Sequence, residues 1–228
     1  MNTNQQMNQI VSQVINNQKS KGYEKSYSVC FLNFQNNRYN LLDDLNQNCL
    51  NLKEYLMDYG MLRKGFLKNQ HSSIYKPLIL FFDSIKDSVV WDADIEDYQN
   101  EKVLQEFVNV YNGIERCLQE MKNDYDWTPS ITLVTKIMMG VLGCVPAFDR
   151  YVIYYLKKLY GKQFKGEFNI QTLKLVYELY KQNEREFIEA TSQLTYIDFD
   201  DNKVSDVPFR VVKMIDNYCF YMGKLISL

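Results

Sequence analysis

Apolar residues recur at helical spacing along most of this chain. Between Arg38 and Tyr59 their positions keep them on one side of a helix, at Leu41, Leu42, Leu45, Cys49, Leu52 and Leu56. A second run of this kind extends from Val103 to Leu118. Residues three and four apart share one face of an α-helix, so each run predicts an amphipathic helix whose apolar face must be buried.

Glycine and proline are scarce, with 9 Gly and 4 Pro among 228 residues. A turn-rich β fold needs more of both, so their scarcity favours long helices. Hydrophobic residues make up 46% of the chain, which is enough for a sizeable core. We therefore expect an all-α protein in which a single domain of roughly eight helices spans residues 21–228. An Asn/Gln-rich amphipathic helix, residues 1–20, is expected to precede it.

Capping residues and apolar spacing locate the remaining helices. Thr128 and Pro129 predict the N-cap and first residue of one helix, and Pro146 predicts the start of the next. Ser26–Gln35 fits either a marginal short strand or the entry to a helix, because short apolar runs do not separate the two. The other expected helices cover residues 72–90, 128–142, 146–160, 170–191 and 207–228.

Charge and motif content argue against several functional classes. The formal net charge is -2 and the pI about 5.6, whereas a protein that depends mainly on phosphate contacts is usually basic. His71 is the only histidine, so we expect no metal site and no His-based catalytic triad. Gly-rich phosphate-binding motifs are absent, and no cofactor is expected.

The cysteines and the N-terminus predict a cytoplasmic protein. Five cysteines, Cys30, Cys49, Cys117, Cys144 and Cys219, lie among apolar neighbours and form no C-x-x-C pair, which is typical of reduced core thiols. The first residues lack the charged and apolar regions of a signal peptide. No apolar run approaches the roughly 20 residues that span a bilayer, so no membrane association is expected.

One stretch, "TKIMMGVLGCVPAFDRYV" from Thr135 to Val152, places charged residues in a strongly apolar setting. Lys136 fits a lysine that extends to solvent, and Asp149 fits a first-turn carboxylate facing a helix N-terminus, with Arg150 on the surface. The alternative interpretation gives Asp149 a catalytic role. A carboxylate at a helix N-terminus is held in its ionised form, which suits a general base or a group that stabilises positive charge.

Basic residues follow this stretch without any acidic residue. They are Arg150, Lys157, Lys158, Lys162 and Lys165, and tyrosines and Phe164 lie between them. Basic and aromatic side chains together suit phosphate contacts and base stacking. The same pattern also fits an ordinary helix with a tyrosine-rich core face and a favourable charge at its C-terminus. Both interpretations stay open at the level of sequence.

The Thr135–Val152 stretch resembles a segment of helix-hairpin-helix DNA glycosylases, especially their divergent 8-oxoguanine-glycosylase-like relatives. In these proteins a helix with a lysine precedes a Pro-x-x-Asp corner and another helix. "FRVVKMIDNYCFYMGK", from Phe209 to Lys224, is similar to their final helix, which carries an Asp and an aromatic residue. The resemblance implies an all-α fold that binds DNA and excises a damaged base. Asp149 would then be the catalytic aspartate and Lys136 the candidate lysine.

Two functional hypotheses follow. The first is a nucleic-acid-associated helical protein that binds DNA or RNA, in the form of a base-excision-type enzyme that uses Asp149. The second is a non-enzymatic interaction or regulatory subunit that contacts a protein partner through its N-terminal helix. A helical bundle that binds a small molecule in an aromatic pocket is a further alternative.

Overall fold

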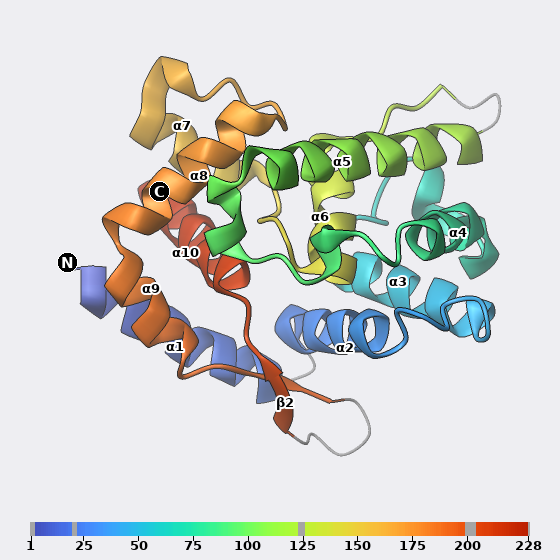
Figure 1. Ribbon diagram of the computed structural model, residues 1–228, viewed down its shortest axis with the longest axis horizontal. Helices are drawn as coiled ribbons and strands as arrows, with labels where there is room; N and C mark the ends of the chain where they lie inside the picture. Colours follow the sequence, from blue (N-terminus) through green and yellow to red (C-terminus); the bar gives the residue numbers. More distant parts are fainter. Residues whose placement is uncertain (1–2, 20–21, 123–125, 199–203, 228) are drawn as a thin grey trace.

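The computed structural model describes residues 3–19, 22–122, 126–198 and 204–227, which form one mostly helical domain (Figure 1). Within these residues there are ten α-helices and one two-stranded hairpin, so the predicted helical fold class is confirmed. The helices are α1 (Thr3–Lys19), α2 (Tyr23–Asn36), α3 (Leu45–Asp58), α4 (Lys76–Ser84), α5 (Glu101–Met121), α6 (Ile131–Leu142), α7 (Arg150–Tyr160), α8 (Ile170–Gln182), α9 (Glu184–Thr191) and α10 (Val211–Ile226).

The marginal strand considered at Ser26–Gln35 does not form, because this segment lies within α2. Tyr27, Phe31 and Phe34 are fully buried, and their spacing of four and three residues places them on one helical face. The strands lie elsewhere. β1 (Thr195–Ile197) pairs antiparallel with β2 (Val204–Pro208), and Tyr196 packs against Tyr27 and Phe31.

Several predicted helices are shorter than expected. The 38–59 helix begins only at Leu45, and residues 72–90 contain the short helix α4 between 3₁₀ turns. The 170–191 helix is interrupted at Asn183, where φ is -136°. The last helix begins at Val211, because residues 204–208 pair in the hairpin instead. In each case the apolar spacing is right, but turns and strand pairing set the ends.

Helices α1 and α10, from opposite ends of the sequence, pack against each other (Figure 1). The apolar face of α1 is buried within the domain, through Met7, Ile10, Val11 and Val14. Helix α10 also packs against α7, where a Cβ atom on Gly223 would lie 2.0 Å from the carbonyl oxygen of Tyr151. Glycine therefore permits a backbone approach at this crossing that no other residue allows.

The start of α10 is fixed by a segment far away in sequence. Asp94 accepts hydrogen bonds from the backbone N–H groups of Val211 and Val212, each at 2.9 Å. Arg210 donates to the carbonyl oxygens of Trp91 and Asp92. These contacts satisfy free N–H groups of the first turn and set where α10 projects its side chains.

Two further features bear on the sequence predictions. All five cysteines are free thiols, and all but the half-buried Cys117 are buried. In the described part of the chain, no helix is both long enough and apolar enough to cross a membrane.

Candidate functional site

A sharp corner joins α6 to α7 and brings the predicted site residues together. Helix α6 ends at Leu142, and its C-cap Gly143 has φ 65°. Thr135 accepts a hydrogen bond from the Phe148 N–H at 2.9 Å, and Thr132 donates to the Phe148 carbonyl at 2.8 Å. The Tyr98 hydroxyl donates to the Cys144 carbonyl. The corner is therefore held by side chains of α6 and of a distant 3₁₀ turn.

Asp149 is the N-cap of α7. Its Oδ1 accepts the backbone N–H groups of Tyr151 at 2.9 Å and Val152 at 3.1 Å. The prediction that Pro146 starts this helix is wrong, because the Ala147 N–H is bonded to Asp216 Oδ1 and the chain stays non-helical until Arg150. With Oδ1 engaged by the helix, Oδ2 of Asp149 lies 3.8 Å from Lys136 Nζ.

Lys136 does not extend to solvent. It lies on a fully buried stretch of α6 and is 5% exposed. Its Nζ sits 4.4 Å from the centre of the Tyr59 ring, an arrangement that favours a cation without hydrogen-bonding it. The interpretation of Lys136 as extending to solvent is therefore wrong, and its amine lies beside Asp149, almost completely shielded from bulk water.

A second buried lysine lies close by. Lys213 on α10 is 1% exposed, and its Nζ donates to Glu24 Oε1 at 3.2 Å, Asp216 Oδ2 at 3.1 Å and Asn217 Oδ1 at 2.7 Å. Its ammonium also lies over the rings of Tyr27 and Tyr59. Lys213 thus ties α10 to α2 through charge-assisted hydrogen bonds.

Both lysines line one pocket of about 680 Å³, a size typical of ligand sites. Its walls come from α1, α2, the segment after α3, α6, the start of α7, and α10. Ionisable residues that line it are Tyr23, Glu24, Asp58, Tyr59, Arg63, Lys136, Asp149, Arg150, Tyr151, Lys213, Asp216, Tyr221 and Lys224. The apolar side of the lining includes Ile10, Val14 and Phe220.

Burial moves Lys136 and Asp149 toward their neutral forms. The pKa of Lys136 is lowered from the ordinary 10.5 because burial disfavours its charge, although Asp216 and Asp149 oppose that effect. Burial likewise raises the pKa of Asp149, against the attraction of Lys136. Burial also disfavours the charge of Lys213, but Glu24 and Asp216 outweigh it, so its pKa is raised. Of the two amines, Lys136 is the one more readily deprotonated.

Other nucleophiles are less suited to this pocket. Burial raises the pKa of the Cys219 thiol, which adjoins the pocket carboxylates, well above its usual range. His71 caps a 3₁₀ turn by accepting the Ser73 N–H, and it does not line the pocket. Among residues 3–19, 22–122, 126–198 and 204–227, no group of three or more His, Cys, Asp or Glu side chains is placed to hold a metal ion.

The predicted basic run divides into two parts. Arg150 lines the pocket at the first residue of α7. Lys157 and Lys158 are exposed near the other end of that helix, about 12 Å further along its axis. Lys162 and Lys165 are exposed beyond the helix. Besides the buried Lys136 and Lys213, the basic residues that line the pocket are Arg63, Arg150 and Lys224, all exposed and drawn from three separate segments.

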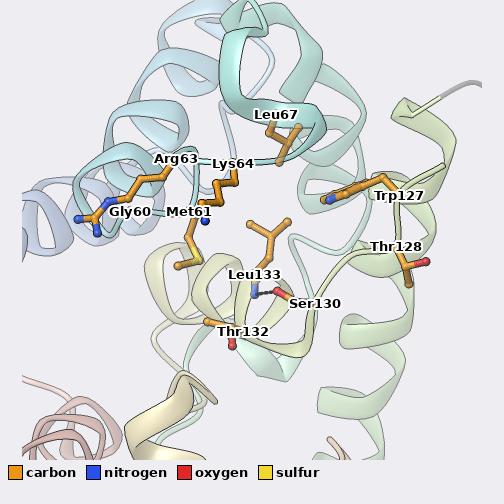
Figure 2. A pocket seen from close by; sticks show the side chains of 10 residues that line it. All are labelled: Gly60, Met61, Arg63, Lys64, Leu67, Trp127, Thr128, Ser130, Thr132 and Leu133. Atoms are coloured by element: carbon orange, nitrogen blue, oxygen red, sulfur yellow. Dashed lines mark hydrogen bonds between the residues drawn. The ribbon is translucent and has the colours of Figure 1, made fainter. Parts of the chain in front are cut away.

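A smaller pocket of about 460 Å³ adjoins the first and shares Met61 and Arg63 with it. Figure 2 shows Leu67, Trp127 and Leu133 around its apolar part, with Arg63 extending away from it. Ser130 accepts the Leu133 N–H and is the N-cap of α6, so the predicted N-cap Thr128 and first residue Pro129 are wrong by two residues. Lys136 and Asp149 do not line this second pocket.

Four residues of the pocket, Glu24, Tyr59, Lys213 and Asn217, were not predicted from the sequence. The one local signal is Lys213 and Asp216 three residues apart within VVKMIDNYCF, where Asn217 is the only other strongly polar residue, because an i,i+3 ion pair in such a run indicates buried charge. Glu24 carries no such signal, since it lies near the polar start of α2.

Comparisons with protein-family models, with curated proteins and with solved structures find no match to this chain.

Proposed function

We propose that this protein is a base-excision enzyme that acts on DNA and uses the amine of Lys136 as its nucleophile. The observation that supports it best is the convergence of Lys136 and Asp149, 3.8 Å apart, in the lining of one pocket. A buried lysine with a lowered pKa is a recognised form of activated nucleophile. The carboxylate beside it suits the role of proton acceptor. The resemblance of Thr135–Val152 to helix-hairpin-helix glycosylases agrees with this assignment.

The chemistry assigns a role to each side chain. The neutral amine of Lys136 attacks C1′ of the damaged nucleotide, and the base leaves with the electron pair of the glycosidic bond. Asp149 takes the proton that the amine loses and returns it to O4′ as the C1′–O4′ bond breaks, so the sugar ring opens to a protonated Schiff base, while the departing base anion takes a proton from water. This cation lies beside Asp149 in a pocket that also holds Glu24 and Asp216, which gives three carboxylates against one other buried lysine, Lys213.

The pocket must receive a nucleotide turned out of the duplex. A volume of about 680 Å³ accommodates a nucleobase with its sugar. Phe220 and Tyr151 contact each other edge to face on the wall and offer aromatic surface for a base. Arg63, Arg150 and Lys224 at the rim are placed to bind backbone phosphates, which compensates for the acidic net charge.

The interaction-protein alternative has less support. It relies on the N-terminal helix as a docking surface, but the apolar face of α1 is already buried against its own domain. The same helix supplies Ile10, Gln13 and Val14 to the pocket wall. We therefore assign α1 to the fold and to the pocket.

Borohydride trapping tests the proposed function. An oligonucleotide duplex with one abasic site or one oxidised base, incubated with the protein and borohydride, is expected to yield a stable adduct on Lys136, because hydride reduces the Schiff base to an amine. An undamaged duplex is the control. DNA binding should weaken with salt at a logarithmic slope of about -2 to -3, as expected for three phosphate contacts. Undetectable binding, or binding that salt does not weaken, would rule the proposal out.

Substitution of Asp149 separates its structural role from its chemical one. Both variants lose the ion pair with Lys136, but asparagine keeps the Oδ1 acceptor of the α7 cap, so Asp149→Ala should be less stable than Asp149→Asn by about 1 kcal/mol. Both remove the carboxylate, and both should reduce the rate of base release by about 10²–10⁴-fold. Thermal unfolding and single-turnover kinetics measure the two effects. Full activity in Asp149→Asn would show that only the cap matters.

A further inference from the structure

Two buried lysines share this pocket, but their amines have different surroundings. The Lys213 ammonium uses all three of its N–H donors, in hydrogen bonds to oxygen atoms of Glu24, Asp216 and Asn217. Lys136 has only Asp149 as an ion-pair partner in the described part of the chain, at a distance beyond hydrogen-bonding range. The side chains of both lysines are almost completely buried.

The carboxylates that Lys213 binds lie close enough to affect Lys136 as well. Both amines are near the ring of Tyr59, at 4.4 Å for Lys136 and 5.9 Å for Lys213. The Lys213 ammonium takes one oxygen of Glu24 and one of Asp216, while Glu24 Oε2 remains buried without a partner. If Lys213 were absent, Glu24 and Asp216 would lose their cation, and Lys136 would be the only buried lysine or arginine among the described residues.

We propose that Lys213 is a positioning residue, which occupies Glu24 and Asp216 and so leaves the Lys136 amine free to act as a nucleophile. The inference rests on the proposed function of Lys136. It goes beyond that function because it assigns the second lysine a role that requires no contact with substrate. Lys213 acts through charge: it neutralises carboxylates that would otherwise hold Lys136 as a bound ammonium.

The charged and titratable groups around Lys136 come from α2, α3 and the segment after it, α7 and α10, whereas α1 contributes none to the pocket lining. They are Glu24 and Tyr23 on α2, Asp58, Tyr59 and Arg63 at the end of α3 and after it, Asp149, Arg150 and Tyr151 at the start of α7, and Lys213, Asp216, Tyr221 and Lys224 on α10. The effects of these charges on the pKa of Lys136 agree with the proposal, since Lys213 lowers this pKa while Glu24 and Asp216 raise it.

Reductive methylation tests this without DNA. Formaldehyde forms an imine with a neutral amine, and cyanoborohydride reduces it to a methylamine, so the pH dependence of the rate reports deprotonation of each lysine. In the wild type, Lys136 should react at lower pH than the exposed Lys224, as read by mass spectrometry of peptides. In Lys213→Met the profile of Lys136 should shift to higher pH, with a loss of about tenfold or more at neutral pH.

A double variant provides the matched control. Lys213→Met with Glu24→Gln has the same charge balance in the pocket as the wild type, so its Lys136 profile should return toward the wild-type one. If Lys213→Met alone does not fold, the test compares Glu24→Gln with the double variant. The Lys136 amine should become reactive at higher pH in the double variant, because Asp216 no longer has the Lys213 ammonium as its partner.

An unchanged profile in Lys213→Met, or one moved to lower pH, would overturn the inference. In the comparison of Glu24→Gln with the double variant, the inference is overturned if Lys136 of the double variant reacts at the same pH as in Glu24→Gln or at a lower pH. The outcome is independent of DNA chemistry. If the methylation profiles follow the expectation but no DNA adduct is trapped, the proposed function fails and the role of Lys213 stands.

Discussion

Replacing Lys136 with glutamine is expected to abolish trapping of the protein on damaged DNA, with a loss of at least about 10³-fold in adduct formation. The amide of glutamine carries no basic lone pair and forms no Schiff base, so the covalent step has no substitute. Glutamine retains a polar end in the same buried position beside Tyr59. Adduct yield on a denaturing gel, with DNA binding measured in parallel, checks the prediction.

Lys224→Gln is the control for this experiment. Lys224 is exposed at the pocket rim, and its loss should weaken DNA binding slightly through one phosphate contact, with trapping retained at saturating protein. Retained trapping in Lys136→Gln would mean that another amine is the nucleophile. Lys213 is the first alternative, and mapping the adduct peptide would identify it.

The pH dependence of trapping follows from the environment of Lys136. Burial lowers the pKa of its ammonium, so the neutral amine is populated at lower pH than in a free lysine. The trapping rate should rise with pH and level off below the ordinary lysine value of 10.5. A midpoint at or above that value would show that burial does not activate this amine.

Replacing Lys213 with methionine is expected to lower the free energy of unfolding by about 3–5 kcal/mol, the usual cost of removing one partner from a buried ion pair. Methionine approximates the length of the lysine side chain but leaves Glu24 and Asp216, which are 2% and 3% exposed, without their cation. Chemical denaturation of the folded variant measures the difference. This is among the largest effects that a single substitution should have in this chain.

The sign of the pH effect can be stated for Lys213. Its pKa is raised in the folded protein, so the stability it contributes is fully present below the unfolded lysine value of about 10.4 and is lost as pH rises toward the folded value. The difference between wild type and Lys213→Met should therefore persist through neutral pH and shrink in strongly alkaline solution.

Two comparisons separate this effect from the loss of a surface charge. Lys174 pairs with Glu101 on the surface, so Lys174→Met should leave stability nearly unchanged. The double variant with Glu24→Gln should recover part of the loss, because one of the two uncompensated carboxylates is removed. Equal stabilities for wild type and Lys213→Met would contradict the buried ion network.

Part of the site could be predicted from the sequence. Lys136 and Asp149 are charged residues within an apolar stretch, and this contrast is visible without any structure. Their convergence could not be predicted, since it depends on how residues 143–149 turn. That turn is set by Thr132 and Thr135 and by the distant Asp216.

The sequence alone determined the helical class of the fold, because apolar spacing and scarce glycine and proline act locally along the chain. The ends of several helices were decided by tertiary contacts, as where Ala147 bonds to Asp216 rather than joining a helix. Tertiary structure also determines which buried charged residues pair with each other. Glu24 and Lys213 are 189 residues apart and meet only because α2 and α10 pack around one pocket. Ion pairing depends on distance in space and on exclusion of water, and spacing along the chain encodes neither for residues so far apart.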